Sequence, residues 1–183
     1  MPSAILDPTG LTERPAAEGL TLAPRPAELS GVKIGLLENG KQNARPLLEE
    51  IAGVLRERYA VGEATIRRKD VFAAPAPPEL VDEMSARCDV VITGVGDCGS
   101  CSASAVADGI LFERHGTPAA VICSDAFRTT AGAMAEVQGA PGYDYITTPH
   151  PVAGLGPEEI HERAEAVAAE VAKLLAGSVR RGV

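Results

Sequence analysis

The stretch that most constrains the fold runs from residue 88 to residue 116, CDVVITGVGDCGSCSASAVADGILFERHG. It opens with an apolar run at 89–94, which is typical of a buried strand, and ends in a segment at 102–115 whose apolar residues follow helical spacing. A tight turn, Cys98-Gly99-Ser100-Cys101, separates the two. A buried strand followed by a helix predicts a parallel α/β unit, with two thiols where the strand ends and the helix begins.

This turn is a favourable place for a thiolate. Glycines allow the backbone to fold closely around Cys98 and Cys101, and Ser100 or Ser102 is available as a helix N-cap. Free N–H groups and the helix dipole favour an anion there, so the ionised fraction of a cysteine with an ordinary pKa of about 8.5 should rise. We therefore expect a functional role for at least one of the two thiols. The alternative is a pair of small buried residues that close the turn.

The rest of the chain repeats the alternation of strand and helix. Strands are predicted at 32–39, 64–69, 89–94, 117–125 and 143–148, and helices at 43–59, 78–87, 102–115, 126–139 and 157–175. Such a pattern requires a parallel sheet covered on both faces, because each right-handed crossover places a helix on one face or the other. We predict a flavodoxin-like or Rossmann-like three-layer α/β sandwich with a five-stranded parallel sheet in the order 2-1-3-4-5, its polar second strand at an edge.

The sequence divides into an arm and one domain. Residues 1–30 are rich in Pro and Ala without a sustained period, which indicates an extended N-terminal arm, and 31–178 form a single α/β domain. Apolar residues of the arm need cover, so we expect the arm to lie on the domain or on a partner subunit, with homo-oligomerisation as one outcome. These residues are Ile5, Leu6, Leu11, Leu20 and Leu22.

Charge and hydropathy exclude several partners. The net charge of −8 argues against nucleic acid and against an anionic membrane surface, since both require clustered cations. No apolar run approaches the roughly 20 residues that span a bilayer, and no export signal is visible. We expect a cytoplasmic protein that acts on a small-molecule substrate and whose cysteines are catalytic, redox-active or metal-binding rather than a disulfide framework.

In this fold, ligands bind beyond the carboxyl ends of the strands. The polar residues predicted at those ends form one pocket, in which we expect Cys98, Cys101 and His150 to be catalytic. The residues expected to bind substrate are Glu38, Asn39, Asp97, Gly99, Ser100, Ser124 and Asp125.

His150 is flanked by Pro149 and Pro151, which restrict its backbone. An imidazole held in this way could deprotonate a thiol or protonate a leaving group, a contribution of about 10² to 10⁴-fold in rate. The alternative is a loop histidine without a special role. Cys123, at the end of an apolar strand, is interpreted as a small hydrophobe.

The sequence indicates no metal and no cofactor. Cys98 and Cys101 have the spacing of a zinc-ligand pair, but the sequence lacks the second close pair of ligands that a structural zinc site requires. Gly94-Val95-Gly96 is followed by Asp97-Cys98-Gly99, which breaks the dinucleotide-binding pattern.

The hexapeptide Gly96-Asp97-Cys98-Gly99-Ser100-Cys101 resembles the UGSC-motif family, in many members of which selenocysteine occupies the first position of the motif. The resemblance extends to 5–9, 34–41 and 147–151. The turn is also similar, more locally, to the selenoprotein component B of glycine, sarcosine and betaine reductases, in which selenium is understood to attack a carbon that bears an amine. These resemblances imply that Cys98 stands in the place of the selenium nucleophile, with Cys101 as its partner and His150 in the same site.

The resulting hypothesis is an enzyme in which Cys98 attacks a small organic substrate and cleaves a C–N or C–S bond, with His150 as acid/base. Cys101 would either resolve the adduct as a disulfide or support the thiolate. A thiol ionises less readily than a selenol, so this chain would depend more on the helix N-terminus and on His150. Two alternatives remain: an accessory subunit that completes a multi-protein reductase or lyase site, and a thiol-disulfide redox protein.

Overall fold

The computed structural model describes residues 19–177. Its strands are β1 (Ile34–Glu38), β2 (Ala64–Arg68), β3 (Val90–Gly96), β4 (Ala119–Ser124) and β5 (Ile146–Thr148). All neighbouring strands are parallel, in the order β2-β1-β3-β4-β5. The predicted fold class and strand order are confirmed.

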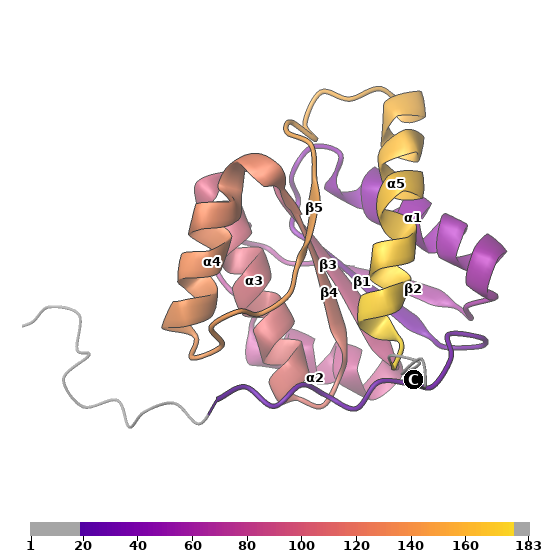
Figure 1. Ribbon diagram of the computed structural model, residues 1–183, viewed down its shortest axis with the longest axis horizontal. Helices are drawn as coiled ribbons and strands as arrows, with labels where there is room; N and C mark the ends of the chain where they lie inside the picture. The colour runs from indigo at the N-terminus through magenta and orange to yellow at the C-terminus, as the bar shows by residue number, and fades with distance from the viewer. Residues whose placement is uncertain (1–18, 178–183) are drawn as a thin grey trace, which may run out of the picture.

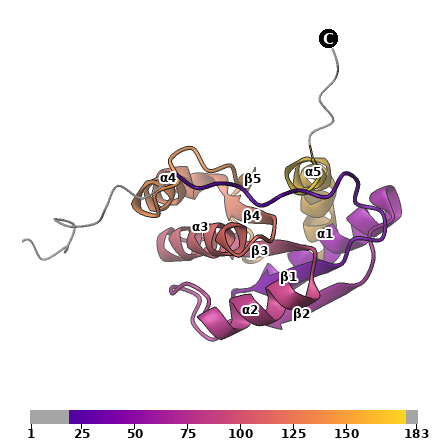
Figure 2. The ribbon, with the colours of Figure 1, turned by 90° about the horizontal axis from the view of Figure 1, so that it is seen from below.

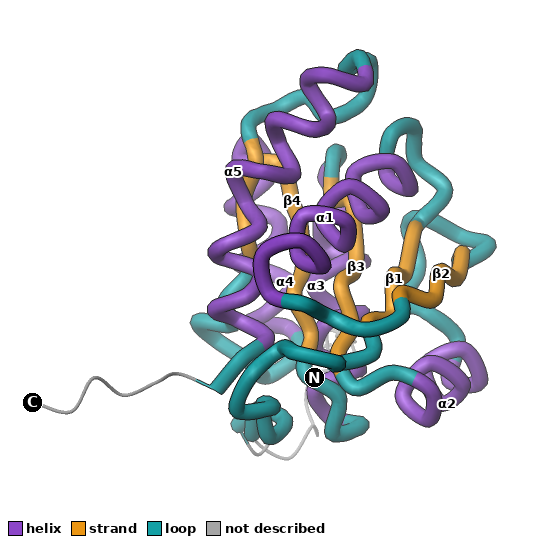
Figure 3. The backbone as a smooth tube through the Cα atoms, turned by 90° about the vertical axis from the view of Figure 1, so that its right-hand side faces the viewer, coloured by secondary structure: helices purple, strands orange, loops and turns teal. Residues whose placement is uncertain are grey.

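Helices cover both faces of the sheet, as Figure 2 shows. They are α1 (Ala44–Tyr59), α2 (Pro78–Arg87), α3 (Gly99–Arg114), α4 (Arg128–Val137) and α5 (Pro157–Leu175). On one side lie α1 and α5, seen in front of the strands in Figure 3, and on the other lie α2, α3 and α4. Within residues 19–177 no helix is both long and apolar enough to cross a membrane.

The alternation of side chains along the strands explains the three layers. Leu36 and Ile92 pack in the cluster that contains the inner faces of α1 and α5, whereas their neighbours Leu37 and Val91 pack against α2 and the end of α3. Every residue of β3 is buried because this strand is central and covered on both faces. The predicted edge strand, β2, is only partly buried.

Two boundaries near the thiols differ from the prediction. β3 continues to Gly96, where it pairs with Cys123 of β4, rather than ending at residue 94. α3 begins at Gly99 rather than at residue 102. The turn between them is therefore shorter than the sequence pattern suggests.

The described part of the predicted arm, residues 19–29, packs along the domain (indigo in Figure 1). Arg25 donates to both carboxylate oxygens of Glu113, at 2.6 and 2.7 Å, and Glu113 also accepts from the N–H groups of Ala23 and Ala119. Ala23 and Leu29 are buried, and Leu22 stays half exposed. The arm residues Ile5, Leu6 and Leu11 lie outside the described residues.

A second buried ion pair ties the loop between β2 and α2 to α3. The Lys69 ammonium donates to Asp108 at 2.5 Å, to Ser104 at 2.6 Å and to the carbonyl of Ala74 at 2.9 Å. The other carboxylate oxygen of Asp108 accepts from the N–H of Ala76 at 2.6 Å. Because both side chains are almost fully buried, removing one of them leaves an uncompensated charge.

We expect Lys69→Met to lower the free energy of unfolding by about 3–5 kcal/mol, measured by urea denaturation. The double variant Lys69→Met/Asp108→Leu should recover part of that loss, because no unpaired charge remains buried. Arg45→Met, which removes an exposed ion pair with Glu49, is the control and should cost less than about 1 kcal/mol. A Lys69→Met protein as stable as the control would contradict the assignment.

Candidate functional site

The two thiols of the turn lie at the N-terminus of α3 and are joined as a disulfide, with their Cα atoms 5.2 Å apart. Cys98 is the N-cap residue, in an extended conformation (φ −157°, ψ 169°), and its Sγ accepts the N–H of Cys101 at 3.2 Å. Cys98 is partly exposed, whereas Cys101 is fully buried. The more exposed of the two cysteines is thus the one whose sulfur accepts an N–H from the first turn of the helix.

The prediction that Ser100 or Ser102 caps this helix is wrong. Ser102 lies inside the first turn, and its hydroxyl donates back to the carbonyl of Cys98 at 2.8 Å. Ser100 is exposed, with its hydroxyl 3.6 Å from the sulfur of Cys98. The cysteine side chain itself takes the capping position.

Asp97, which directly precedes Cys98, binds the loop that follows β5. One carboxylate oxygen lies 2.9 Å from Nδ1 of His150, and the other accepts the N–H groups of Val152 at 3.0 Å and Ala153 at 2.9 Å. Burial opposes ionisation of Asp97, but these N–H donors, together with His150, outweigh it and hold the pKa of the carboxyl below its usual value. Asp97 is therefore an ionised acceptor at neutral pH.

His150 is held by three further groups. Its backbone N–H donates to Asp125 at 3.1 Å, and the ring of Phe127 meets the imidazole edge-on with centroids 5.3 Å apart. The hydroxyl of Ser124 lies 3.3 Å from Nδ1 and donates to the carbonyl of Gly96 at 3.1 Å. Among residues 19–177 no hydrogen bond is made to Nε2 of His150, whose side chain is 40% exposed.

Ser124, His150 and Asp97 do not form a serine-hydrolase triad. In a triad the serine and the carboxylate bond to opposite nitrogens of the imidazole. Here both lie against Nδ1. This geometry leaves Ser124 without a base to activate it. The ring nitrogen of His150 that stays available is Nε2.

The side chains of Glu38 and Asn39 form hydrogen bonds to nearby backbone groups. Glu38 accepts the N–H of Gly40 at 2.6 Å, and the Asn39 amide donates to the carbonyl of Val95 at 2.9 Å. Both residues are buried and hold the turn after β1 against β3. Asn43 takes the N-cap position of α1 without a side-chain capping bond, and its amide donates to the carbonyls of Val152 and Leu155.

Apart from Glu38 and Asn39, the predicted substrate-binding residues fall into two groups. Gly99 and Ser100 lie beside Cys98 in the thiol turn, whereas Asp97, Ser124 and Asp125 contact His150. Sequence reasoning missed Phe127 and the role of Asn43. An aromatic residue two positions after Asp125, next to a strand end, was the available signal for Phe127.

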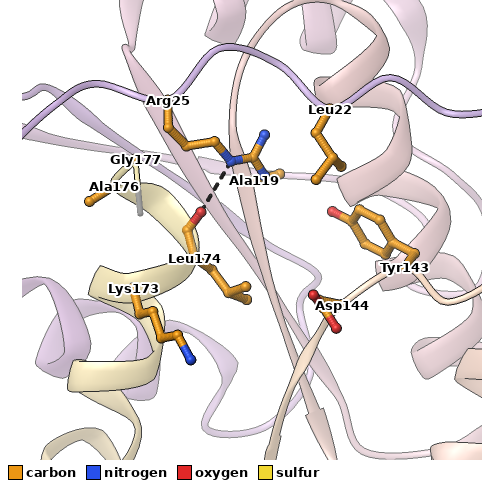
Figure 4. Close-up of a pocket in the computed structure, with 9 residues that line it drawn as sticks. All are labelled: Leu22, Arg25, Ala119, Tyr143, Asp144, Lys173, Leu174, Ala176 and Gly177. Carbon is orange, nitrogen blue, oxygen red and sulfur yellow. Dashed lines mark hydrogen bonds between the residues drawn. The ribbon is translucent and has the colours of Figure 1, made fainter. Parts of the chain in front are cut away.

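A separate pocket of about 480 Å³ lies near the start of β4 and the end of α5 (Figure 4). Arg25 reaches over it and donates to the carbonyl of Leu174 at 3.2 Å, and Tyr143 and Lys173 are also on its wall. None of its lining residues is a predicted site residue. Within residues 19–177, no three His, Cys, Asp or Glu side chains gather closely enough to hold a metal ion.

The model of the UGSC family matches residues 4–177. The chain belongs to the UGSC family. This confirms the family resemblance carried by the thiol turn, whereas the similarity to the reductase component B stays a prediction. No curated protein sequence matches this chain.

Two solved structures are similar to this UGSC-family chain. A diflavin flavoprotein A3 from Nostoc sp. has 12% sequence identity and a TM-score of 0.42, over 80% of this chain and 94% of that one. The flavodoxin-like domain of a Synechococcus sp. protein has 9% identity and a TM-score of 0.39, over 75% and 96%.

The four cysteines of this UGSC-family chain should differ sharply in reactivity. Burial raises the pKa of the Cys123 thiol to about 12 and also raises that of Cys88. After reduction, we expect iodoacetamide to label Cys98 in the folded protein, and to label Cys101, Cys123 and Cys88 only after denaturation. Peptide mapping by mass spectrometry measures this order, and early labelling of Cys123 would contradict it.

Asp97 should contribute stability in a pH-dependent way. Since its pKa is depressed in the folded state, the contribution is present above the ordinary value of about 3.9 and is lost as the pH falls through the folded-state value. We expect the difference in unfolding free energy between wild type and Asp97→Asn to be largest near neutral pH and to shrink under acid. Urea unfolding across this range, with the exposed Asp144→Asn as control, measures it. A difference that grows towards low pH would contradict the assignment.

Proposed function

We propose that this protein is a thiol-dependent enzyme in which Cys98 attacks a small organic substrate and cleaves a carbon–heteroatom bond. Cys101 is the partner thiol and His150 the acid/base. One observation carries the proposal: Cys98, the partly exposed member of the pair, caps α3, and the residue before it binds His150.

The nucleophile is Cys98 rather than Cys101. A thiolate at position 98 accepts the N–H of Cys101 and lies at the positive end of the helix dipole, which favours the anion. Cys101 is buried beneath it, within bonding distance of its sulfur but away from solvent. This arrangement suits an attacking thiol and a resolving thiol.

In the first step, the Cys98 thiolate attacks a carbon that bears a nitrogen or sulfur group. A C–S bond forms, the carbon–heteroatom bond breaks, and the leaving group takes a proton from His150. The product is a thioether between Cys98 and the substrate carbon.

In the second step, the Cys101 thiolate attacks the sulfur of Cys98. The S–S bond forms, the S–C bond breaks, and its electron pair passes to the substrate carbon, which then takes a proton. The carbon is reduced by two electrons while the two thiols are oxidised to the disulfide, which an external dithiol reduces. Since the electron pair needs delocalisation, the substrate class is a compound with the leaving group next to a carbonyl or carboxylate.

A thiol-disulfide redox protein is the second candidate, and the pairing of an exposed with a buried cysteine favours it. In that case the electrophile is a disulfide of a partner rather than a carbon. The accessory-subunit hypothesis and homo-oligomerisation are compatible with either chemistry, and half-exposed Leu22 on the packed N-terminal segment supports a contact there. We place the protein in the cytoplasm, where dithiol reductants are abundant.

The test is the pH dependence of iodoacetamide alkylation at Cys98 in the reduced protein, read by peptide mapping. We expect a midpoint below the ordinary thiol value of about 8.5. His150→Ala should slow alkylation at neutral pH by about tenfold or more, because one pKa unit changes the thiolate fraction tenfold. His161→Ala, which alters an exposed histidine paired with Glu50, is the matched control and should leave the rate unchanged.

The outcomes separate the candidates. If Cys98 reacts no faster than a free cysteine and His150→Ala changes nothing, the covalent mechanism fails and the accessory-subunit hypothesis gains. If Cys98 is activated, incubating Cys101→Ser with α-substituted carboxylates should accumulate a thioether adduct on Cys98. Adducts formed only with disulfide compounds would favour the redox protein.

A further inference from the structure

The contact between Asp97 and His150 constrains the proton on the imidazole. An ionised carboxylate accepts hydrogen bonds and donates none, so a ring nitrogen 2.9 Å from it must carry the hydrogen. That nitrogen is Nδ1. A neutral imidazole protonated at Nδ1 has its lone pair on Nε2.

We propose that Asp97 is a positioning residue that holds His150 in the Nδ1–H tautomer, which leaves Nε2 as the only ring nitrogen that exchanges a proton with the site. The catalytic consequence rests on the proposed function, in which His150 is the acid/base. The tautomer itself does not depend on it.

Asp97 cannot turn away from the imidazole without losing other bonds. Its second carboxylate oxygen accepts the N–H groups of Val152 and Ala153, so both oxygens are engaged by the segment 150–153. The carbonyl of Val152 in turn accepts from the amide of Asn43. The carboxylate and the loop therefore hold each other in place.

Ser124 cannot specify the tautomer in the same way. A hydroxyl both donates and accepts, so it can face Nδ1 in either protonation state. Its distance of 3.3 Å from Nδ1 is longer than that of Asp97, and its hydrogen is directed to the carbonyl of Gly96. Asp97 is the neighbour of Nδ1 that only accepts.

The substitution Asp97→Asn should reverse the tautomer. The two backbone N–H groups of Val152 and Ala153 require an acceptor, so the asparagine oxygen takes their side and its NH2 group faces His150. An NH2 group donates, and Nδ1 must then lose its hydrogen to Nε2. The exchange keeps the shape of the side chain and changes only donors and acceptors.

Long-range ¹H–¹⁵N correlation spectra of protein labelled at histidine measure the tautomer directly. They are recorded about two pH units above the ordinary pKa of a free imidazole, which is about 6.5. The chain has 3 histidines, and His150→Gln assigns the signal of His150. His115, whose Nδ1 lies 2.8 Å from the carbonyl of Leu111 and whose Nε2 lies 3.4 Å from Asp82, reports whether a variant disturbs an imidazole outside the site.

We expect Nδ1–H in the wild type and Nε2–H in Asp97→Asn, with the His115 signals unchanged. Asp125→Asn is the matched control, since an asparagine oxygen still accepts the backbone N–H of His150, and the tautomer should stay Nδ1–H. A wild-type His150 in the Nε2–H form overturns the proposal without any variant. An unchanged tautomer in folded Asp97→Asn overturns it as well.

Alkylation of Cys98 in the same variants separates this inference from the proposed function. If His150 acts through Nε2, Asp97→Asn should slow alkylation at neutral pH to within about threefold of the His150→Ala rate, whereas Asp144→Asn, at an exposed position before β5, should not. If the tautomer reverses as expected while His150→Ala leaves the rate unchanged, the positioning role stands and the acid/base function fails.

Discussion

The carboxylate of Asp97 connects two parts of the sheet that are not neighbours. Asp97 follows β3 and the segment it binds follows β5, and β4 lies between these strands. The register brings them together, because Gly96 pairs with Cys123 and Ser124 pairs with Thr148. The three strands therefore end at the same height, and a side chain one residue beyond β3 can reach across β4. Asp97 therefore ties the loop that carries His150 to the turn that carries the thiols.

In the thiol turn, the sulfur of Cys98 is a hydrogen-bond acceptor both in the disulfide and as a thiolate. The sulfur of Cys98 accepts an N–H of α3 while bonded to Cys101. A thiolate at the same place accepts that N–H more strongly, because a charged acceptor forms the stronger hydrogen bond. The cap of the helix is thus retained in both states, and the reduced state gains from the helix dipole. A serine cap beside the cysteines, as the sequence suggested, would have left the thiolate without this N–H donor.

Much of the fold could be predicted because it follows from local patterns. The apolar run of β3, the polar edge strand β2 and the alternation of elements determine the sheet and its order. Which residues stand at the strand ends was also predictable. Their hydrogen-bond partners were not. Asn43 stands at the start of α1, yet its amide donates to a loop carbonyl 109 residues away in sequence. Arg25 and Glu113, 88 residues apart, likewise attach a segment that composition alone described as an arm. Such long-range partners depend on loop paths, which leave no periodic signal.

α3 links these long-range contacts to the thiols. Its N-terminus carries Cys98 and Cys101, its middle holds Lys69 through Asp108, and its end holds Arg25 through Glu113. Both carboxylates are buried, so neither contact can open without exposing an unpaired charge to an apolar environment. A shift of the helix along its axis would strain both ion pairs at once. The thiol turn is therefore attached to a helix that is restrained at its middle and at its far end, and movements that accompany oxidation and reduction must be confined to the turn and to the side chains around it.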